Sequence, residues 1–134
     1  MTYINRSLKL SIIPTKNKGH GVITLSNIKK NTYIVEYGTI RISNKEAESS
    51  CKLCQHSTWP CHKHNRLMQL PDKSWLDCDH NHISGFINHN NDLLANCTTE
   101  TLYVKRDNLL HVYIKTLRDI RKNEELTYNY FAHG

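Results

Sequence analysis

The stretch Ser84-Gly85-Phe86-Ile87-Asn88-His89-Asn90-Asn91 joins an apolar pair to four side chains rich in hydrogen-bond donors and acceptors. Burial of Phe86 and Ile87 would anchor the backbone of this segment. The amide of Asn88 and the imidazole of His89 would then be held rigidly, with their hydrogen-bonding groups directed at a neighbouring segment or a ligand. Taken singly, an Asn or a His of this kind is more often a core residue whose hydrogen bonds are satisfied.

Two other segments are unusual, one on each side of this stretch. Near the start of the chain, Lys18-Gly19-His20-Gly21-Val22 places a glycine on either side of a histidine. Glycine permits positive φ angles and lets the backbone approach a ligand closely, although by itself the pattern is that of an ordinary turn. Near the end lies Asn123-Glu124-Glu125-Leu126-Thr127-Tyr128-Asn129-Tyr130-Phe131.

Length and charge limit the kind of protein. With 134 residues the chain makes one domain with a single modest core. A net charge of +6 favours polyanionic partners such as nucleic acid, but the charge is spread along the chain, which is typical of a solvated surface. The sequence has neither the pattern of a signal peptide nor an apolar run of membrane-spanning length, so we expect an intracellular protein without a membrane partner.

Hydrophobic alternation predicts strands and no long amphipathic helix. The clearest case is a hairpin around 106–108, in which Val112 and Ile114 alternate with His111, Tyr113 and Lys115. The predicted strands cover residues 7–13, 22–25, 32–43, 75–79, 101–105 and 109–117.

An internal similarity links residues 25–34 and 117–126. Each segment has an apolar residue, a basic turn that ends in Asn, and a strand. Two copies are too few for a repeat array, so they predict two similar strand-turn-strand units.

Residues 44–73 differ in composition because cysteine and histidine are concentrated there. Cys51 and Cys54 have the spacing of metal ligands, and four ligands of this kind suit tetrahedral Zn²⁺. The candidate ligands are Cys51, Cys54, Cys61 and His62, with His64 as the alternative to His62. A surface loop with reduced thiols is the competing interpretation. We expect Cys78 and Cys97 to be small buried residues.

In this order the three unusual segments resemble the SET-domain protein lysine methyltransferases. In that family a G-x-G, an R-F-x-N-H-S-C segment and a G-E-E-L-T-x-D-Y segment build one active site. The resemblance runs from about Ser11 to Phe131. It implies a mostly β SET-domain fold, with small curved sheets and a C-terminal pseudoknot, in a single domain 1–134 with a Cys/His-rich insert at about 44–73.

Some positions depart from the family pattern. Gly85 stands in place of the Arg, Asn90 and Asn91 in place of the Ser and Cys, and Asn129 in place of the Asp. Ala95-Asn96-Cys97 stands where the family has P-N-C.

The resemblance implies transfer of a methyl group from S-adenosylmethionine to a lysine ε-amine. A free lysine has a pKa of about 10.4, and a narrow, partly apolar channel favours its neutral, nucleophilic form. The implied catalytic residues are Tyr130, Tyr128 and Tyr37, although for Tyr37 packing in a sheet is an equal alternative. A Tyr at position 128 favours mono- or dimethylation. The implied cofactor-binding residues are Lys18, Gly19, His20, Gly21, Asn88, His89 and Tyr130.

The implied substrate is a flexible lysine-bearing protein tail, first of all that of histone H3, which would place the protein in a nucleus. A basic tail requires an acidic groove, for which Glu36, Asp77 and Asp79 are candidates. The family's C-terminal Cys cluster does not follow Phe131, so we expect the lysine channel to be closed by the 44–73 insert, by Phe131 and His133, or by a second subunit in a homodimer. The alternatives are a non-catalytic SET-like binding module and a zinc-stapled interaction protein.

Overall fold

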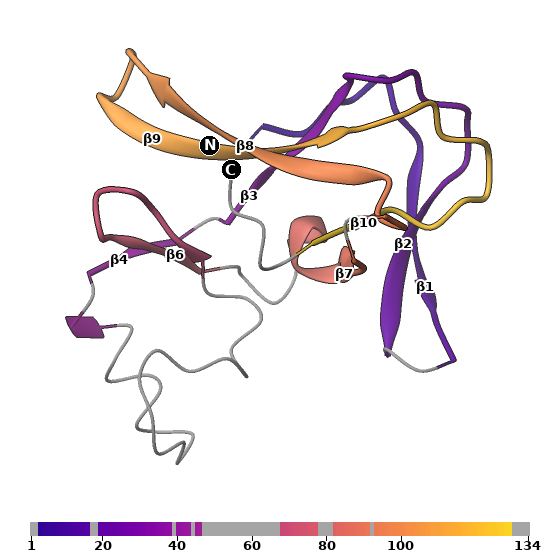
Figure 1. The fold of residues 1–134 in the computed structure, drawn as a ribbon, viewed down its shortest axis with the longest axis horizontal. Coiled ribbons are helices and arrows are strands. Elements are labelled where there is room, and N and C mark those ends of the chain that lie inside the picture. Colours follow the sequence, from indigo (N-terminus) through magenta and orange to yellow (C-terminus); the bar gives the residue numbers. More distant parts are fainter. Residues whose placement is uncertain are drawn as a thin grey trace.

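The computed structural model describes residues 3–16, 19–38, 40–43, 45–46, 68–77, 82–91 and 93–129. Figure 1 shows them as short strands joined by loops, with a short 3-10 helix, η1 (Ile83–Phe86), before β7 (Asn88–His89). The described strands form four small sheets of two or three strands each. The predicted mostly β fold is therefore confirmed. Among these residues, no helix is long and apolar enough to cross a membrane.

The longest strands form the antiparallel sheet β3-β9-β8 (Figure 1). It consists of β3 (Tyr33–Tyr37), β9 (Leu109–Thr116) and β8 (Cys97–Val104). The predicted hairpin is confirmed, and its turn contains Asn108 with φ 58°. Val112 and Ile114 point into the core, as their alternation predicts. The first strand begins at Cys97, four residues earlier than predicted, because Cys97 and Thr99 are also buried against the core.

The other strands make smaller sheets around this one. β1 (Leu10–Pro14) and β2 (His20–Thr24) form an antiparallel hairpin. β6 (Trp75–Asp77) lies between β4 (Ile40–Ile42) and β5 (Met68–Gln69) in an antiparallel sheet. The expectation of one strand over 32–43 was wrong, because the chain turns at Gly38, where φ is +76°.

The segment 44–73 is described only at its two ends. Met68 and Leu70, at its C-terminal end, are buried in the core. The predicted metal ligands Cys51, Cys54, Cys61, His62 and His64 lie outside the described residues, and so does Cys78. Zinc binding therefore stays a prediction.

The two similar segments pair with each other. Ile28 and Ile120 exchange backbone hydrogen bonds of 2.8 and 2.7 Å. Asn31 and Asn123, which end the basic turns, both have positive φ, at 63° and 72°. Asparagine adopts this left-handed conformation more readily than most residues. The sequence similarity therefore reflects two equivalent turns that face one another, and this joins the start of the domain to its end.

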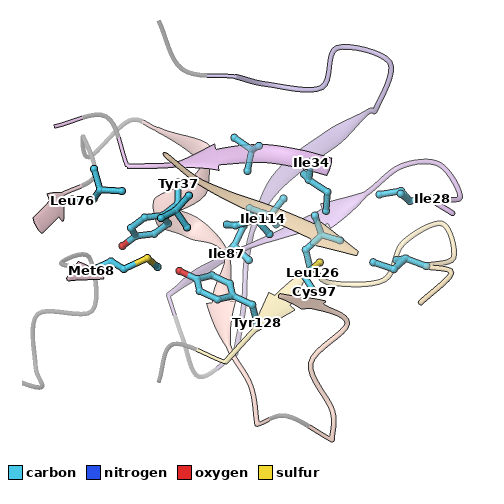
Figure 2. Packing of buried hydrophobic residues seen from close by; sticks show 14 of the residues in the cluster. Ile28, Ile34, Tyr37, Met68, Leu76, Ile87, Cys97, Ile114, Leu126 and Tyr128 are labelled. Carbon is cyan, nitrogen blue, oxygen red and sulfur yellow. The ribbon is translucent and has the colours of Figure 1, made fainter. Parts of the chain in front are cut away.

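The core lies between the β3-β9-β8 sheet and the C-terminal segment (Figure 2). Ile87 is 1% exposed and Phe86 is partly buried, so the pair anchors its segment as predicted. Cys97 is buried as predicted, and burial raises the pKa of its thiol to about 12. Fifteen residues form the cluster: Val22, Ile28, Ile34, Val35, Tyr37, Met68, Leu70, Leu76, Ile87, Cys97, Val112, Ile114, Ile120, Leu126 and Tyr128.

Candidate active site

The central stretch and the C-terminal segment lie side by side. β7 (Asn88–His89) pairs in parallel with β10 (Thr127–Tyr128), so that Asn88 is opposite Thr127 and His89 opposite Tyr128. A further hydrogen bond of 3.1 Å runs from the Asn90 backbone N–H to the Tyr128 carbonyl. Segments almost forty residues apart in the sequence are thereby brought together, as the resemblance requires.

The third segment reaches the same place through β2. The Leu126 backbone N–H donates to the Val22 carbonyl at 2.8 Å. The side-chain amide of Asn88 donates to the His20 carbonyl at 2.9 Å and to Glu125 Oε2 at 2.8 Å. Both donor hydrogens of Asn88 are therefore engaged, and its acceptor oxygen Oδ1 is held in a fixed direction.

Gly21 packs closely against this junction. A Cβ at this position would lie 2.6 Å from Glu125 Oε2 and 3.0 Å from Asn88 Nδ2, so the Glu125 carboxylate that holds Asn88 would have to shift. Gly19 differs, because its φ is +73° and the space where a Cβ would lie is open. Gly21 therefore allows close packing of three segments, and Gly19 provides a turn with an exposed backbone.

Two tyrosines meet at the other side of β10. The rings of Tyr37 and Tyr128 make an edge-to-face contact with centroids 6.4 Å apart, and each residue is 2% exposed. Figure 2 shows both hydroxyl groups at the same end of the core, near Met68. β3 supplies one ring and β10 the other, so the predicted channel tyrosines are brought together.

Of the remaining predicted site residues, the structure describes His20 and His89 but not Lys18 and Tyr130. His20 is exposed, and its ring makes an edge contact with Phe86 at 6.2 Å. His89 is partly buried beside Tyr128. Lys18 and Tyr130 lie outside the described residues.

The proposed acidic groove has to be corrected at Glu36. Glu36 pairs with Tyr113 across the sheet, so its side chain points to the face opposite Tyr37. Its carboxylate is engaged there by His111 Nδ1 at 2.7 Å and by the Tyr3 backbone N–H at 3.3 Å. Glu36 is therefore not available to a groove beside Tyr37. Asp79 lies outside the described residues, and only the backbone of Asp77 is described.

Sequence reasoning missed the role of Asn96. This residue is 3% exposed; its amide donates to the Glu125 carbonyl at 2.8 Å and accepts from the Thr127 backbone N–H at 2.9 Å. It therefore fixes the C-terminal segment just before β10. Glu125, which holds Asn88, was also missed as a site residue. The sequence signal for both residues was their position inside the motifs: Asn96 lies in Ala95-Asn96-Cys97, and Glu125 lies in the pair Glu124-Glu125.

Residues 19–131 match the sequence profile of the SET domain, a span that includes all the described segments of the site. The chain belongs to the SET-domain family. Among curated relatives of this SET domain, the histone-lysine N-methyltransferase, H3 lysine-4 specific, of Neurospora crassa is 30% identical over 82% of the chain. The H3 lysine-36 specific enzyme of Cryptococcus neoformans is 32% identical over 90% of it. The chain spans only 8% and 14% of those two proteins.

Solved structures agree on the fold of this SET domain. Two mutant forms of the Chaetomium thermophilum Polycomb Repressive Complex 2, one humanized and inhibitor-bound and one apo, match with TM-scores of 0.72 and 0.73. Each match has 22% sequence identity and covers 92% of this chain and 15% of the matched chain.

Proposed function

We propose that this SET domain transfers a methyl group from S-adenosylmethionine to a lysine ε-amine of a protein, with the tail of histone H3 as the first candidate. The observation that carries the proposal is the parallel pairing of β7 with β10, tied to β2 through Asn88. Two of the curated relatives are named as histone-lysine N-methyltransferases, which supports the same reaction.

The residues present fit the methyl donor. S-adenosylmethionine carries an α-amino group, which needs an acceptor such as the Oδ1 of Asn88, held in place by the two bonds of its amide. The open space at Gly19 lets a ligand reach the backbone of the β1–β2 turn. We therefore assign the donor to Lys18, Gly19, His20, Gly21, Asn88, His89 and Tyr130. The donor supplies an activated methyl group on a sulfonium.

The tyrosines would prepare the lysine. The buried rings of Tyr37 and Tyr128 exclude water and disfavour the ammonium form, so the amine loses its proton before it reacts. The phenols of Tyr128 and Tyr130 orient the amine lone pair in line with the sulfur–methyl bond. S-adenosylmethionine, when bound, would supply the methyl group to this amine, and the positive charge would leave with the methylated lysine. A Tyr at position 128 restricts the space and favours mono- or dimethylation.

The test is methyl transfer by the purified chain. The chain is incubated with methyl-labelled S-adenosylmethionine and histone octamers, and the products are located by mass spectrometry. We expect transfer to a lysine, with a loss of roughly a hundredfold in Tyr130→Phe and Asn88→Ala. Leu93→Ala, at a residue that is 96% exposed, is the control and should keep full activity. Absence of both transfer and cofactor binding would contradict the proposal.

Two other results would favour the alternatives. Cofactor binding without turnover, unchanged in Tyr130→Phe, would favour a non-catalytic binding module. Zinc in the purified protein, lost in Cys51→Ser and Cys54→Ser, would establish the predicted metal site. If its loss also unfolded the whole chain, a zinc-stapled interaction protein would be favoured.

Three further proposals accompany the histone proposal. They are a nuclear location, contact with nucleosomal DNA through the positive charge of the chain, and a homodimer. Sedimentation with and without nucleosomes tests the last two.

A further inference from the structure

The outer face of the β3-β9-β8 sheet carries a groove that is separate from the candidate active site. Its volume is about 400 Å³, within the range of sites that bind small ligands. Tyr113 lies in this groove, whereas Val112 and Tyr37 face the core on the other side of the sheet. We call it the tyrosine groove; its lining residues are Tyr3, Tyr33, Leu102, Tyr103, Val104 and Tyr113.

The tyrosine rings stand at steep angles to one another. Tyr113 makes edge-to-face contacts with Tyr3 and Tyr33, at centroid distances of 6.1 and 5.8 Å and an interplanar angle of 71° in both pairs. Tyr103 is 60% exposed and Tyr3 42%. Rings arranged in this way form walls, and the negative faces of their π systems attract cations.

The same face already holds an ammonium group. Lys115 Nζ lies 5.8 Å from the ring centroid of Tyr33 and forms an ion pair of 2.9 Å with Glu100. The Tyr33 hydroxyl donates to the same carboxylate at 2.7 Å. Lys115 is not among the residues that line the groove, so its ammonium group does not fill the groove.

The local charge is compatible with a further cation, although the chain as a whole is positive at +6. Two carboxylates on this face contact His111: Glu36 at Nδ1 and Asp107 at Nε2, each at 2.7 Å. Together with Glu100, these carboxylates offset the permanent charges of Lys115 and of nearby Arg106. The face therefore carries no excess positive charge that would repel a ligand.

We propose that the tyrosine groove binds the methylated side chain of a lysine in a protein tail. The faces of aromatic rings attract the positive charge of a methylated ammonium, and their apolar surface favours burial of its methyl groups. An unmodified ammonium is more strongly hydrated and gains less from such walls. The proposal rests on the proposed function only in that methyl transfer would produce the methylated lysine. The groove would hold this methylated tail while the site on the core side of the sheet acts on another lysine.

A ligand titration monitored by NMR tests the charge requirement. Tetramethylammonium chloride and the neutral neopentyl alcohol, which has a similar shape, are added separately to the whole chain. We expect tetramethylammonium to shift the ring resonances of Tyr3, Tyr33 and Tyr113 and to bind more tightly than the alcohol. Equal binding of the two would show a merely apolar groove, and no shift at these rings would show no site; either result overturns the proposal.

Peptides and variants then test the methyl requirement and the rings. A trimethyllysine peptide should bind more tightly than the same peptide with unmodified lysine. Tyr113→Phe keeps the ring and should retain binding, whereas Tyr113→Leu and Tyr3→Leu should weaken it about two- to thirtyfold. Tyr3 is 42% exposed and pairs with Glu36 through its backbone, so its variant should fold even if the Tyr113 variant does not. These binding measurements need no methyl transfer, so their failure is distinguishable from a failure of the proposed activity.

Discussion

Replacement of Asn96 by Ala tests the attachment of the C-terminal segment. The change removes two hydrogen bonds, one of 2.8 Å to the Glu125 carbonyl and one of 2.9 Å from the Thr127 backbone N–H. Thr127 is 6% exposed, so its N–H would be left buried without a partner. Each unpaired buried group costs about 1–3 kcal/mol, so the two lost hydrogen bonds predict a loss of about 2–6 kcal/mol. This is a large part of the about 5–15 kcal/mol by which domains are normally stable.

Urea denaturation followed by circular dichroism measures this loss. Asn27→Ala is the matched control, because it removes one exposed hydrogen bond, of 2.9 Å from the Lys122 backbone N–H, which water can replace. The control should lose less than about 1 kcal/mol. The reasoning is refuted if Asn96→Ala costs no more than the control, because the C-terminal segment would then be held by other contacts.

Three other changes have defined outcomes. Gly21→Ala places a methyl group 2.6 Å from Glu125 Oε2, so the Glu125 carboxylate must shift and its hydrogen bond from Asn88 is disturbed. We expect weaker binding of S-adenosylmethionine in calorimetry with a loss of stability of only about 1 kcal/mol; unchanged binding would show that the junction is loose. Burial raises the pKa of the Cys97 thiol to about 12, so iodoacetamide at pH 8 should modify it only after unfolding, as peptide mass spectrometry can show. The hydrogen bond from Lys115 lowers the pKa of Glu100, so this pair stabilises the fold above the ordinary glutamate pKa of about 4.3, and its contribution is lost as the pH falls through the lowered value. The difference in stability between wild type and Glu100→Gln should therefore shrink in acid; a difference that grows would contradict the sign.

Local patterns were sufficient to predict the β8–β9 hairpin and the anchoring of the central segment. The alternation around Val112 and Ile114 depends only on the two-residue period of a strand, and the hairpin followed from it. The Phe86-Ile87 pair indicated an anchored segment because burial of apolar side chains is a local requirement. The similarity between 25–34 and 117–126 predicted two like turns. It did not predict that Ile28 pairs with Ile120, since a local pattern carries no information about the partner of a segment.

Polar residues were harder to assign because their roles depend on tertiary neighbours. Asn96 and Glu125 look like ordinary surface residues in the sequence, and only their buried hydrogen bonds reveal that they hold the site together. Glu36 was expected to face a basic substrate. In the structure it meets His111 on the other face of the sheet, a partner 75 positions away. The tyrosine groove was missed for the same reason, because Tyr3, Tyr33 and Tyr113 come from separate segments.

The most direct test of the central claim is an amide chemical-shift map of the labelled chain during titration with S-adenosylmethionine. The account predicts saturable shifts at residues 19–21, 88–89 and 127–128, and none at the tyrosine groove. Saturable binding that leaves these three segments unshifted, or no binding at all, would contradict it.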